Sequence, residues 1–169
     1  HGTHITGIIV GNGTLDNQTL GIAPAAEVNF YQIEYDTSGL LARWGTLYSM
    51  FSHSLQNQAR THTNAWGSVN QPGQYTADSH SADSFIVDQP AYLAIFSGGD
   101  IGQNQGATTT PPGTAKNVLT IGASTTGMGG TDPQGSVWSN NSGGTLDGRV
   151  KPDLVAPGVE ICSARASEA

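Results

Sequence analysis

The feature that most limits how this chain can fold is a continuous apolar run over residues 91–96, which reads Ala-Tyr-Leu-Ala-Ile-Phe. Strands with one face in solvent alternate apolar and polar residues, whereas strands covered on both faces carry unbroken apolar runs, as parallel strands do. The run therefore predicts a buried parallel strand. The segments around it decide what kind of sheet it belongs to.

Helix-like and strand-like segments alternate along the rest of the chain. Apolar spacing predicts helices at residues 1–10, 46–59 and 81–88, the second with Thr46 as its cap. β-rich composition predicts strands at residues 28–33, 61–66, 91–96, 117–122 and 160–163. No internal repeat is present. Such alternation is typical of an α/β domain with a mostly parallel sheet, and 169 residues suffice for one domain.

Composition narrows the class of partner. Charged residues make up 11% of the chain, and 6 Lys and Arg against 13 Asp and Glu give a net charge of −7. An acidic chain without basic clusters suits neither nucleic acid nor anionic membranes, so we expect neither as a partner. No apolar stretch reaches the length of a membrane span. The single Cys162 has no internal disulfide partner, and we expect it to be buried in the last strand.

The chain opens on His1-Gly2-Thr3-His4, which begins the first predicted helix. Small residues at Gly2, Thr3 and Gly7 would let a backbone or a substrate approach this helix closely, which favours His1 as an exposed, usable base. In the alternatives, His1 is an ordinary residue at a cut end, or His1 and His4 hold a metal from neighbouring turns. No acidic or Cys partner lies at ligand spacing, which weighs against the metal.

Two loops follow predicted strands at the edge where α/β sheets bind ligands, beyond the carboxyl ends of the strands. The first is Ala65-Trp66-Gly67, and the second is Ser97-Gly98-Gly99-Asp100. An ordinary core position would also explain Trp66. Dinucleotide binding by the second loop would need the full glycine fingerprint and a following helix, so a glycine pair alone is insufficient.

Five segments now fall into one order along the chain. They begin at His1, Thr63, Ser97, Gly113 and Gly148, and the last two read Gly-Thr-Ala-Lys-Asn-Val-Leu-Thr-Ile-Gly-Ala and Gly-Arg-Val-Lys-Pro-Asp-Leu-Val-Ala-Pro-Gly. In this order the chain resembles the subtilisin-like serine peptidases over nearly its whole length. The sequences of the five segments are most similar to those of the large alkaline secreted members. The resemblance implies a three-layer α/β/α sandwich that hydrolyses peptide bonds in proteins through a Ser-His-Asp triad.

The resemblance assigns roles residue by residue. His1 matches the triad histidine, which takes the serine proton and returns it to the leaving amine, and His4 matches a buried structural position. Two segments match the walls of the specificity pocket, one of which also pairs with the substrate backbone. They are Ala65, Trp66 and Gly67 on one side, and Ser97, Gly98 and Gly99 on the other. Glycine in the second wall is expected to leave room for a large substrate side chain. A third segment, Ser38, Gly39 and Leu40, lies where the family's other substrate-lining segment runs. Its turn-forming residues alone would also explain this stretch.

Asp100 departs from the family pattern, which usually has asparagine at this position. The asparagine amide donates a hydrogen bond to the developing oxyanion, whereas an ionised carboxylate only accepts. Losing one such donor lowers turnover by a factor on the order of a hundred to a thousand, a magnitude taken from a subtilisin. Some similar relatives carry Asp here and remain active. We therefore expect Asp100 to lower activity without abolishing it.

The resemblance also indicates two triad members that these residues lack. The family's aspartate precedes the histidine motif, and its nucleophile lies in a Gly-Thr-Ser-Met-Ala type motif after the Pro-Gly turn. Asp36-Thr37-Ser38-Gly39 imitates the aspartate motif but follows the histidine, and Ser163 and Ser167 lack the context of the nucleophile. We expect a partial peptidase domain over residues 1–169, incomplete at both ends and inactive alone. The alternatives are a catalytically impaired pseudoprotease or peptide-binding module, and a metal hydrolase that uses His1 and His4.

The implied chemistry needs no cofactor. Family members often bind structural calcium, and loops 12–17 and 131–134 carry acidic and carbonyl-rich sequence that suits it, although no ligands are assigned. Asn-x-Ser/Thr triplets begin at Asn12, Asn17 and Asn140, which is compatible with a secreted protein. The expected partners are protein or peptide substrates, and the sequence indicates no oligomeric state.

Overall fold

The computed structural model describes residues 1–14, 19–33, 42–43, 45–102, 106–127 and 133–166. The chain forms two compact units, one of His1–Arg43 with Ile161–Ala169 and the other of Trp44–Glu160. The larger unit holds a sheet and two helices, and the smaller unit holds the first helix. None of the described helices is both long and apolar enough to cross a bilayer.

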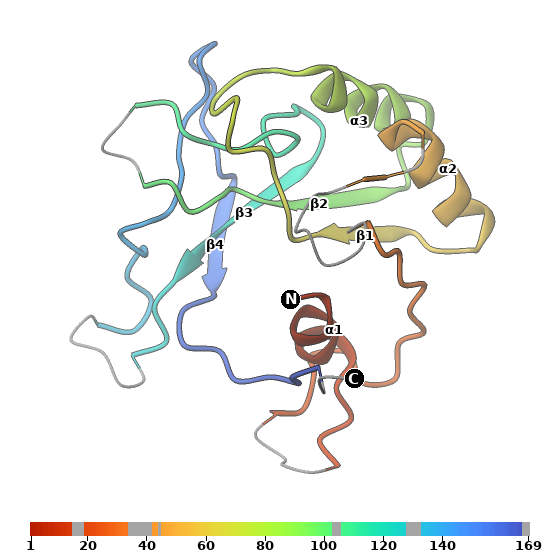
Figure 1. Cartoon of the computed structure of the whole chain (residues 1–169), viewed down its shortest axis with the longest axis vertical. Helices are drawn as coiled ribbons and strands as arrows, with labels where there is room; N and C mark the ends of the chain where they lie inside the picture. The colour runs from red at the N-terminus through yellow and green to blue at the C-terminus, as the bar shows by residue number, and fades with distance from the viewer. Residues whose placement is uncertain (15–18, 34–41, 44, 103–105, 128–132, 167–169) are drawn as a thin grey trace. The chain divides into compact units, whose positions relative to one another are not determined.

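The larger unit is built on a four-stranded parallel sheet (Figure 1). Its strands, in spatial order, are β1 (Thr61–Asn64), β2 (Leu93–Ser97), β3 (Leu119–Ser124) and β4 (Leu154–Pro157). The strands predicted around residues 61–66, 91–96 and 117–122 therefore exist, with boundaries shifted by a few residues. The parallel α/β architecture that the apolar run predicted is confirmed.

Two helices of this unit, α2 (Leu47–Gln56) and α3 (Ala77–Asp88), lie on one side of the sheet (Figure 1). The helix predicted over residues 46–59 is confirmed as α2. It begins where its cap was predicted, since the Thr46 hydroxyl accepts the N–H of Ser49 at 3.2 Å. A hydroxyl at this position satisfies one of the backbone donors that a helix start leaves open.

Helix α3 begins at Ala77, earlier than the start predicted at residue 81. Thr76 and Ser79 form a capping box, in which each side chain accepts the backbone N–H of the other residue. The usual box carries Glu or Gln at the second position, so a Thr-x-x-Ser pattern was not recognised as a helix start.

An aromatic cluster forms the core between these helices and the sheet. The ring centroid of Phe51 on α2 lies 5.6 Å from that of Phe85 on α3 and 6.4 Å from that of Phe96 on β2. Along β2, Ala94 and Phe96 are buried, whereas the Leu93 side chain is 41% exposed. The apolar run predicted that both faces of β2 are buried. In the structure one face is more buried than the other, because α2 and α3 both lie on that face.

The last strand lies earlier in the chain than predicted. Residues 160–163 were expected to form it, but β4 ends at Pro157. Glu160 has φ 58°, a left-handed conformation that interrupts an extended chain, while Leu154 and Val155 pair with β3. Cys162, which was expected to be buried in this strand, is exposed. Both predictions are wrong for the same reason, since the β-forming residues that pair lie before the Pro-Gly turn.

The smaller unit contains α1 (Gly2–Val10), which confirms the predicted first helix. The chain returns to the end of this helix, where the Ile22 N–H donates to the Ile8 carbonyl at 3.0 Å. Residues 28–33 were predicted to be a strand, and they form none in the structure. Their β-branched and aromatic side chains favour strands only where a partner strand completes the ladder, and Phe30 here is 62% exposed.

Candidate functional site

The ends of β1 and β2 place two of the predicted loops side by side in the larger unit. Asn64 ends β1 and lies opposite Phe96 in the parallel register, so both chains leave the same carboxyl edge of the sheet. The buried Asn64 amide joins the two strands, since its Nδ2 donates to the Ile95 carbonyl at 3.1 Å. The structure thereby brings together Ala65, Trp66 and Gly67 with Ser97, Gly98, Gly99 and Asp100.

Trp66 and Gly67 are fixed by separate contacts. The indole of Trp66 packs edge-on against Phe96 with a centroid distance of 5.8 Å, and the residue is only partly buried. A Cβ at Gly67 would collide with the Thr110 hydroxyl, so only glycine allows this approach. The next residue donates its N–H to the Pro111 carbonyl at 2.8 Å. Trp66 therefore combines a core contact with an accessible part, on a segment that has little room to shift.

Gly98 and Gly99 carry the chain out of β2. The Gly98 N–H donates to the Ile121 carbonyl at 2.8 Å, and its carbonyl accepts the Thr110 N–H at 2.9 Å. Gly99 has φ 99°, and a Cβ there would lie 2.7 Å from Thr110 Cγ2 and 2.9 Å from Ser142 Oγ. A side chain at position 99 would therefore meet Thr110 and Ser142, which accounts for glycine there.

Asp100 is exposed, and the peptide groups on either side of it are held. The Ser142 N–H donates to the Gly99 carbonyl at 3.0 Å, and the Ile101 N–H donates to the Ser142 hydroxyl, also at 3.0 Å. Sequence reasoning missed Ser142, because no local pattern pairs residues 41 positions apart. In the sequence, Ser142 stood out only as the third residue of an Asn-x-Ser triplet, which indicated glycosylation and not a structural bond.

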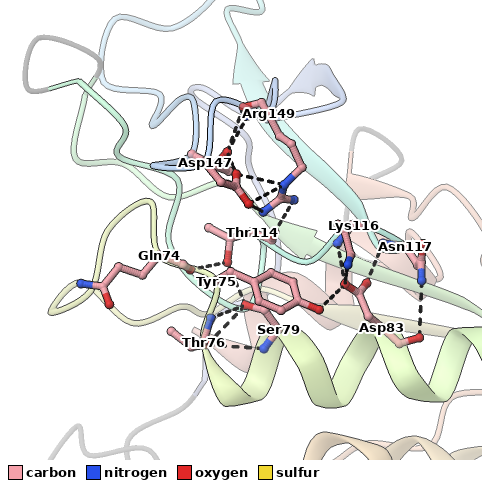
Figure 2. A network of polar contacts seen from close by, with 11 residues as sticks. Gln74, Tyr75, Thr76, Ser79, Asp83, Thr114, Lys116, Asn117, Asp147 and Arg149 are labelled. Carbon is pink, nitrogen blue, oxygen red and sulfur yellow. Dashed lines mark hydrogen bonds and ion pairs between the residues drawn. The ribbon is translucent and has the colours of Figure 1, made fainter.

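A second polar cluster in the larger unit joins α3 to the segment before β3 (Figure 2). The buried carboxylate of Asp83 accepts the Tyr75 hydroxyl at 2.7 Å and the backbone N–H groups of Lys116 and Asn117 at 3.0 and 2.7 Å. Desolvation, followed by the bond to Asp83, raises the pKa of Tyr75 to about 12. These groups are engaged with one another, so the cluster secures residues 113–117 and offers no reactive side chain.

Two cations flank the Tyr75 ring in this cluster (Figure 2). Lys116 Nζ lies 5.0 Å and the Arg149 guanidinium carbon 5.6 Å from the ring centroid. Arg149 also pairs with Asp147 at 2.9 Å and donates to the Thr114 carbonyl at 2.7 Å. The hydrogen bonds from Arg149 hold the pKa of Asp147 down, at about 2. The loop that carries Asp147 and Arg149 is thus tied to the same segment as Asp83.

In the smaller unit, His1 and His4 have different surroundings. His1 is exposed and is the N-cap residue of α1. The His4 ring is partly buried, and its Nε2 lies 3.1 Å from the Ile161 carbonyl. Ser163 donates its hydroxyl to the His4 carbonyl at 2.7 Å, which gives this serine a structural bond. His4 is therefore engaged with the segment after residue 160, and His1 is the accessible imidazole of the two.

The small residues of α1 are approached by other segments of the same unit. A Cβ at Gly2 would lie 2.8 Å from the Phe30 ring, and one at Gly7 would collide with the Ser163 hydroxyl. An open cavity of about 400 Å³ lies beside them, lined by Thr3, Thr6, Gly7, Phe30 and Ala164. Packing within the unit therefore accounts for glycine at both positions, without a substrate.

Some predicted residues lie outside the described part of the chain. These are Ser38, Gly39 and Leu40, with the rejected Asp36 and Ser167. Loops 12–17 and 131–134 are described only in part. Within the residues that the structure describes, no three His, Cys, Asp or Glu side chains gather where they could hold a metal ion.

Comparisons with known proteins bear on all of these residues. The subtilase family model matches residues 1–169. A serine protease/ABC transporter B family protein, tagA of Dictyostelium discoideum, is 32% identical over 130 residues, which cover 73% of this chain and 7% of that protein. The subtilisin-like serine protease AsES of Sarocladium strictum is 29% identical over 171 residues, which cover 96% of this chain and 37% of that protein. The chain therefore spans well under half the length of either relative.

One solved structure extends the comparison to the fold. The prenylagaramide maturation protease PagA superposes with a TM-score of 0.71, and the match covers 98% of this chain and 54% of that one. The two sequences are 23% identical over this match, so the likeness bears on the fold alone.

Proposed function

Because the chain belongs to the subtilase family of serine proteases, we propose that the complete protein is a serine endopeptidase that hydrolyses peptide bonds in proteins through a Ser-His-Asp triad. One observation carries the proposal. The family matches all 169 residues of a chain in which two candidate substrate loops leave the same edge of a parallel sheet. The family itself implies protein substrates.

In this proposal His1 is the triad histidine. Its exposure at the start of α1 supports the role, because a general base must be able to reach the proton that it removes. His1 takes the proton of the serine hydroxyl as that oxygen attacks the scissile carbonyl, and then gives it to the leaving amine. The triad aspartate and serine are contributed by polypeptide outside these 169 residues, which on their own do not hydrolyse peptides.

The two loops at the ends of β1 and β2 are proposed to receive an extended peptide. Ala65, Trp66 and Gly67 form one wall, and Ser97, Gly98 and Gly99 form the other. Their place beyond adjacent strand ends supports this role, since main-chain groups there are suited to pair with a peptide backbone. Ser38, Gly39 and Leu40 are proposed as a third lining segment on the resemblance alone.

Asp100 is proposed to occupy the position from which the family stabilises the oxyanion. Its exposure at the end of the Gly98-Gly99 turn supports this assignment. An ionised carboxylate there repels the negative tetrahedral intermediate and donates no hydrogen bond, so turnover is lower than an asparagine would allow. Backbone N–H groups supply the remaining stabilisation, and activity persists at a reduced level.

A catalytically impaired pseudoprotease, which binds peptides without cutting them, is the second candidate. The exposed carboxylate of Asp100 favours it, because the charge at this position opposes the reaction. Such a protein would keep the two loops beyond β1 and β2 and use them for docking. It differs from the first candidate in one measurable respect, which is cleavage.

Hydrolysis of a denatured protein substrate by the complete protein separates the two candidates. The endopeptidase predicts cleavage by the wild type, and a fall in kcat of about a millionfold in His1→Ala, the magnitude found in a subtilisin. His80→Ala, which changes an exposed histidine on α3, is the matched control and should cleave at the wild-type rate. Peptide binding by the wild type without cleavage would establish the docking module instead. Equal rates in wild type and His1→Ala would show that His1 is not the base.

We further propose that the complete protein is exported. Asn12 and Thr14 are exposed, and the Asn12 side chain accepts the Thr14 N–H at 3.1 Å in a turn where a glycosylated asparagine would be accessible. The triplet at Asn140 differs, because its third residue, Ser142, is fully buried. A mass loss on glycosidase treatment of protein recovered from culture medium is the expected result, and retention inside the cells would contradict export.

A further inference from the structure

Ser142 bonds to the backbone on both sides of Asp100. Its N–H donates to the Gly99 carbonyl at 3.0 Å, and its hydroxyl accepts the Ile101 N–H at 3.0 Å. The Ser142 side chain is 0% exposed, so no water competes for these bonds. One small residue thus fixes the two peptide groups that set the direction in which Asp100 leaves the backbone.

The next residue of the loop is held from a different segment. The Gly102 carbonyl accepts the Thr108 hydroxyl at 2.6 Å, and the same hydroxyl accepts the Gly143 N–H at 3.0 Å. The Gly102 N–H donates to the Asn140 carbonyl at 2.9 Å. Thr108 is buried as well. It therefore links the Asp100 loop to the segment that contains Ser142.

That segment is itself anchored to the sheet through Asn141. The buried Asn141 amide makes two bonds with the backbone of Ala123 on β3, since its Oδ1 accepts the Ala123 N–H at 2.7 Å and its Nδ2 donates to the Ala123 carbonyl at 2.5 Å. The side chain thereby takes the place of a neighbouring strand. The loop after β2 is thus anchored to β3 through the segment that contains Ser142.

Gly99 explains why the holding residue must be small. A Cβ at Gly99 would lie 2.9 Å from Ser142 Oγ, so the serine oxygen occupies the space that the glycine leaves. A larger residue at position 142 would press on the Gly99 backbone. The two residues fit one another, with Gly99 next to Asp100 in the loop and Ser142 reaching the loop from a separate segment.

From these contacts we infer that Ser142 is a positioning residue, which sets the orientation of the Asp100 side chain toward the scissile carbonyl of the substrate, with Thr108 and Asn141 holding it in place. The inference rests on the proposed function, because it assigns a task to Asp100 in the reaction. Ser142 itself touches no substrate. Its effect is expected in the chemical step, since orientation at the reacting centre changes kcat more than binding.

The first test compares Ser142→Ala with Ser79→Ala in the complete protein. Ser79 is an equally buried serine on α3 whose hydroxyl bonds to Thr114 at 2.8 Å and accepts the Thr76 N–H at 3.3 Å, so the control loses buried hydroxyl bonds away from the Asp100 loop. Because an aimed Asp100 carboxylate opposes the oxyanion, Ser142→Ala should raise kcat several-fold with KM within about twofold, and Ser79→Ala should change neither. Equal kinetic constants in Ser142→Ala and wild type, or an equal change in both variants, would overturn the inference.

The second test couples Ser142 to Asp100. If Asp100 repels the oxyanion, Asp100→Asn raises kcat of the otherwise wild-type protein by about tenfold or more, because the amide now donates. In the Ser142→Ala background this gain should largely disappear, since the amide is no longer aimed. A gain of the same size in both backgrounds would show that Ser142 does not position residue 100.

Amide hydrogen exchange tests the contacts without relying on activity. Exchange at Ile101 should accelerate about tenfold in Ser142→Ala and stay unchanged in Ser79→Ala. If Ser142→Ala does not fold, Thr108→Val removes the hold on Gly102 and Thr108→Ser keeps it, and only the valine variant should show the effects. A wild-type protein that neither cuts nor reacts at a serine would refute the function and the positioning role together, whereas unchanged exchange at Ile101 would refute the contacts alone.

Discussion

Two polar regions of the larger unit, each with buried members, hold their loops through different kinds of group. Around Asp83, the partners are a carboxylate, a phenol and two flanking cations (Figure 2). Around Asp100, the bonds that hold the described part of the loop join uncharged groups of the backbone, Ser142, Asn141 and Thr108. A broken charged network leaves a buried charge or strong donors unsatisfied, which is costly, whereas a broken neutral bond costs less. We therefore expect the first region to contribute more to stability, and the second to hold the loop that carries Asp100.

Asp83→Ala should produce the largest loss of stability. The substitution removes the buried carboxylate that accepts the Tyr75 hydroxyl and the part-buried backbone N–H groups of Lys116 and Asn117. Because hydrogen bonds to a charged acceptor contribute about 1.5–3 kcal/mol each, we expect the unfolding free energy of the complete protein to fall by about 3–5 kcal/mol in a denaturant titration. The molecules that remain folded should keep the wild-type KM. A loss below about 1 kcal/mol would show that the network contributes no more than a surface ion pair does.

The pH dependence of unfolding contains a contribution from His62, which has to be separated from the contributions of the two polar regions. Burial lowers the pKa of His62, on β1, from 6.5 to about 4. The folded state favours the neutral ring, so this contribution is complete above pH 6.5 and is lost as the pH falls through about 4, by about 3 kcal/mol. His62→Phe retains an aromatic ring beside Phe51 and should remove this part of the pH profile of unfolding. An unchanged profile in the variant would contradict the assignment.

Gly99→Ala tests the neutral region against a matched glycine. Gly135 has φ 84° with nothing within 4 Å of a Cβ, whereas at Gly99 the added atom would meet Thr110 and Ser142. Gly135→Ala should cost about 1 kcal/mol through its backbone conformation alone, and Gly99→Ala about 2 kcal/mol. The kinetic outcome should differ more, since only Gly99→Ala should change kcat. Equal effects of the two substitutions on stability and kcat would show that the contacts of position 99 with Thr110 and Ser142 have no consequence of their own.

Asp147→Asn should have the smallest effect. The hydrogen bonds from Arg149 lower the pKa of Asp147 to about 2, so its stabilising contribution is present above pH 3.8 and is lost as the pH falls through about 2. The carboxylate is exposed, and solvent screens the pair. We expect the denaturation midpoint at neutral pH to move far less than in Asp83→Ala. A comparable shift would show that the exposed Asp147 carboxylate contributes as much to stability as the buried Asp83 carboxylate does.

The sequence predicted the parts of the fold that local patterns determine. The apolar run at residues 91–96 indicated a parallel strand, and Thr46 marked the start of a helix, because burial and capping leave a signature within a few residues. Residues 28–33 and 160–163 had the composition of strands and formed none. Strand formation depends on a partner elsewhere in the chain, which composition does not reveal.

The candidate site divides in the same way. Topology alone indicated that the residues after β1 and β2 would meet, since parallel strands end at one edge. The residues that hold the loop could not be found from the sequence, because Ser142 bonds to Ile101 over 41 positions and Asp83 bonds to Asn117 over 34.

Covalent labelling of the complete, folded protein with a serine-reactive phosphonate tests the central claim most directly. The account predicts that one serine outside residues 1–169 is labelled, and that His1→Ala abolishes the reaction while His80→Ala does not. A folded wild-type protein that takes up no label, or that labels equally well without the His1 imidazole, would contradict it.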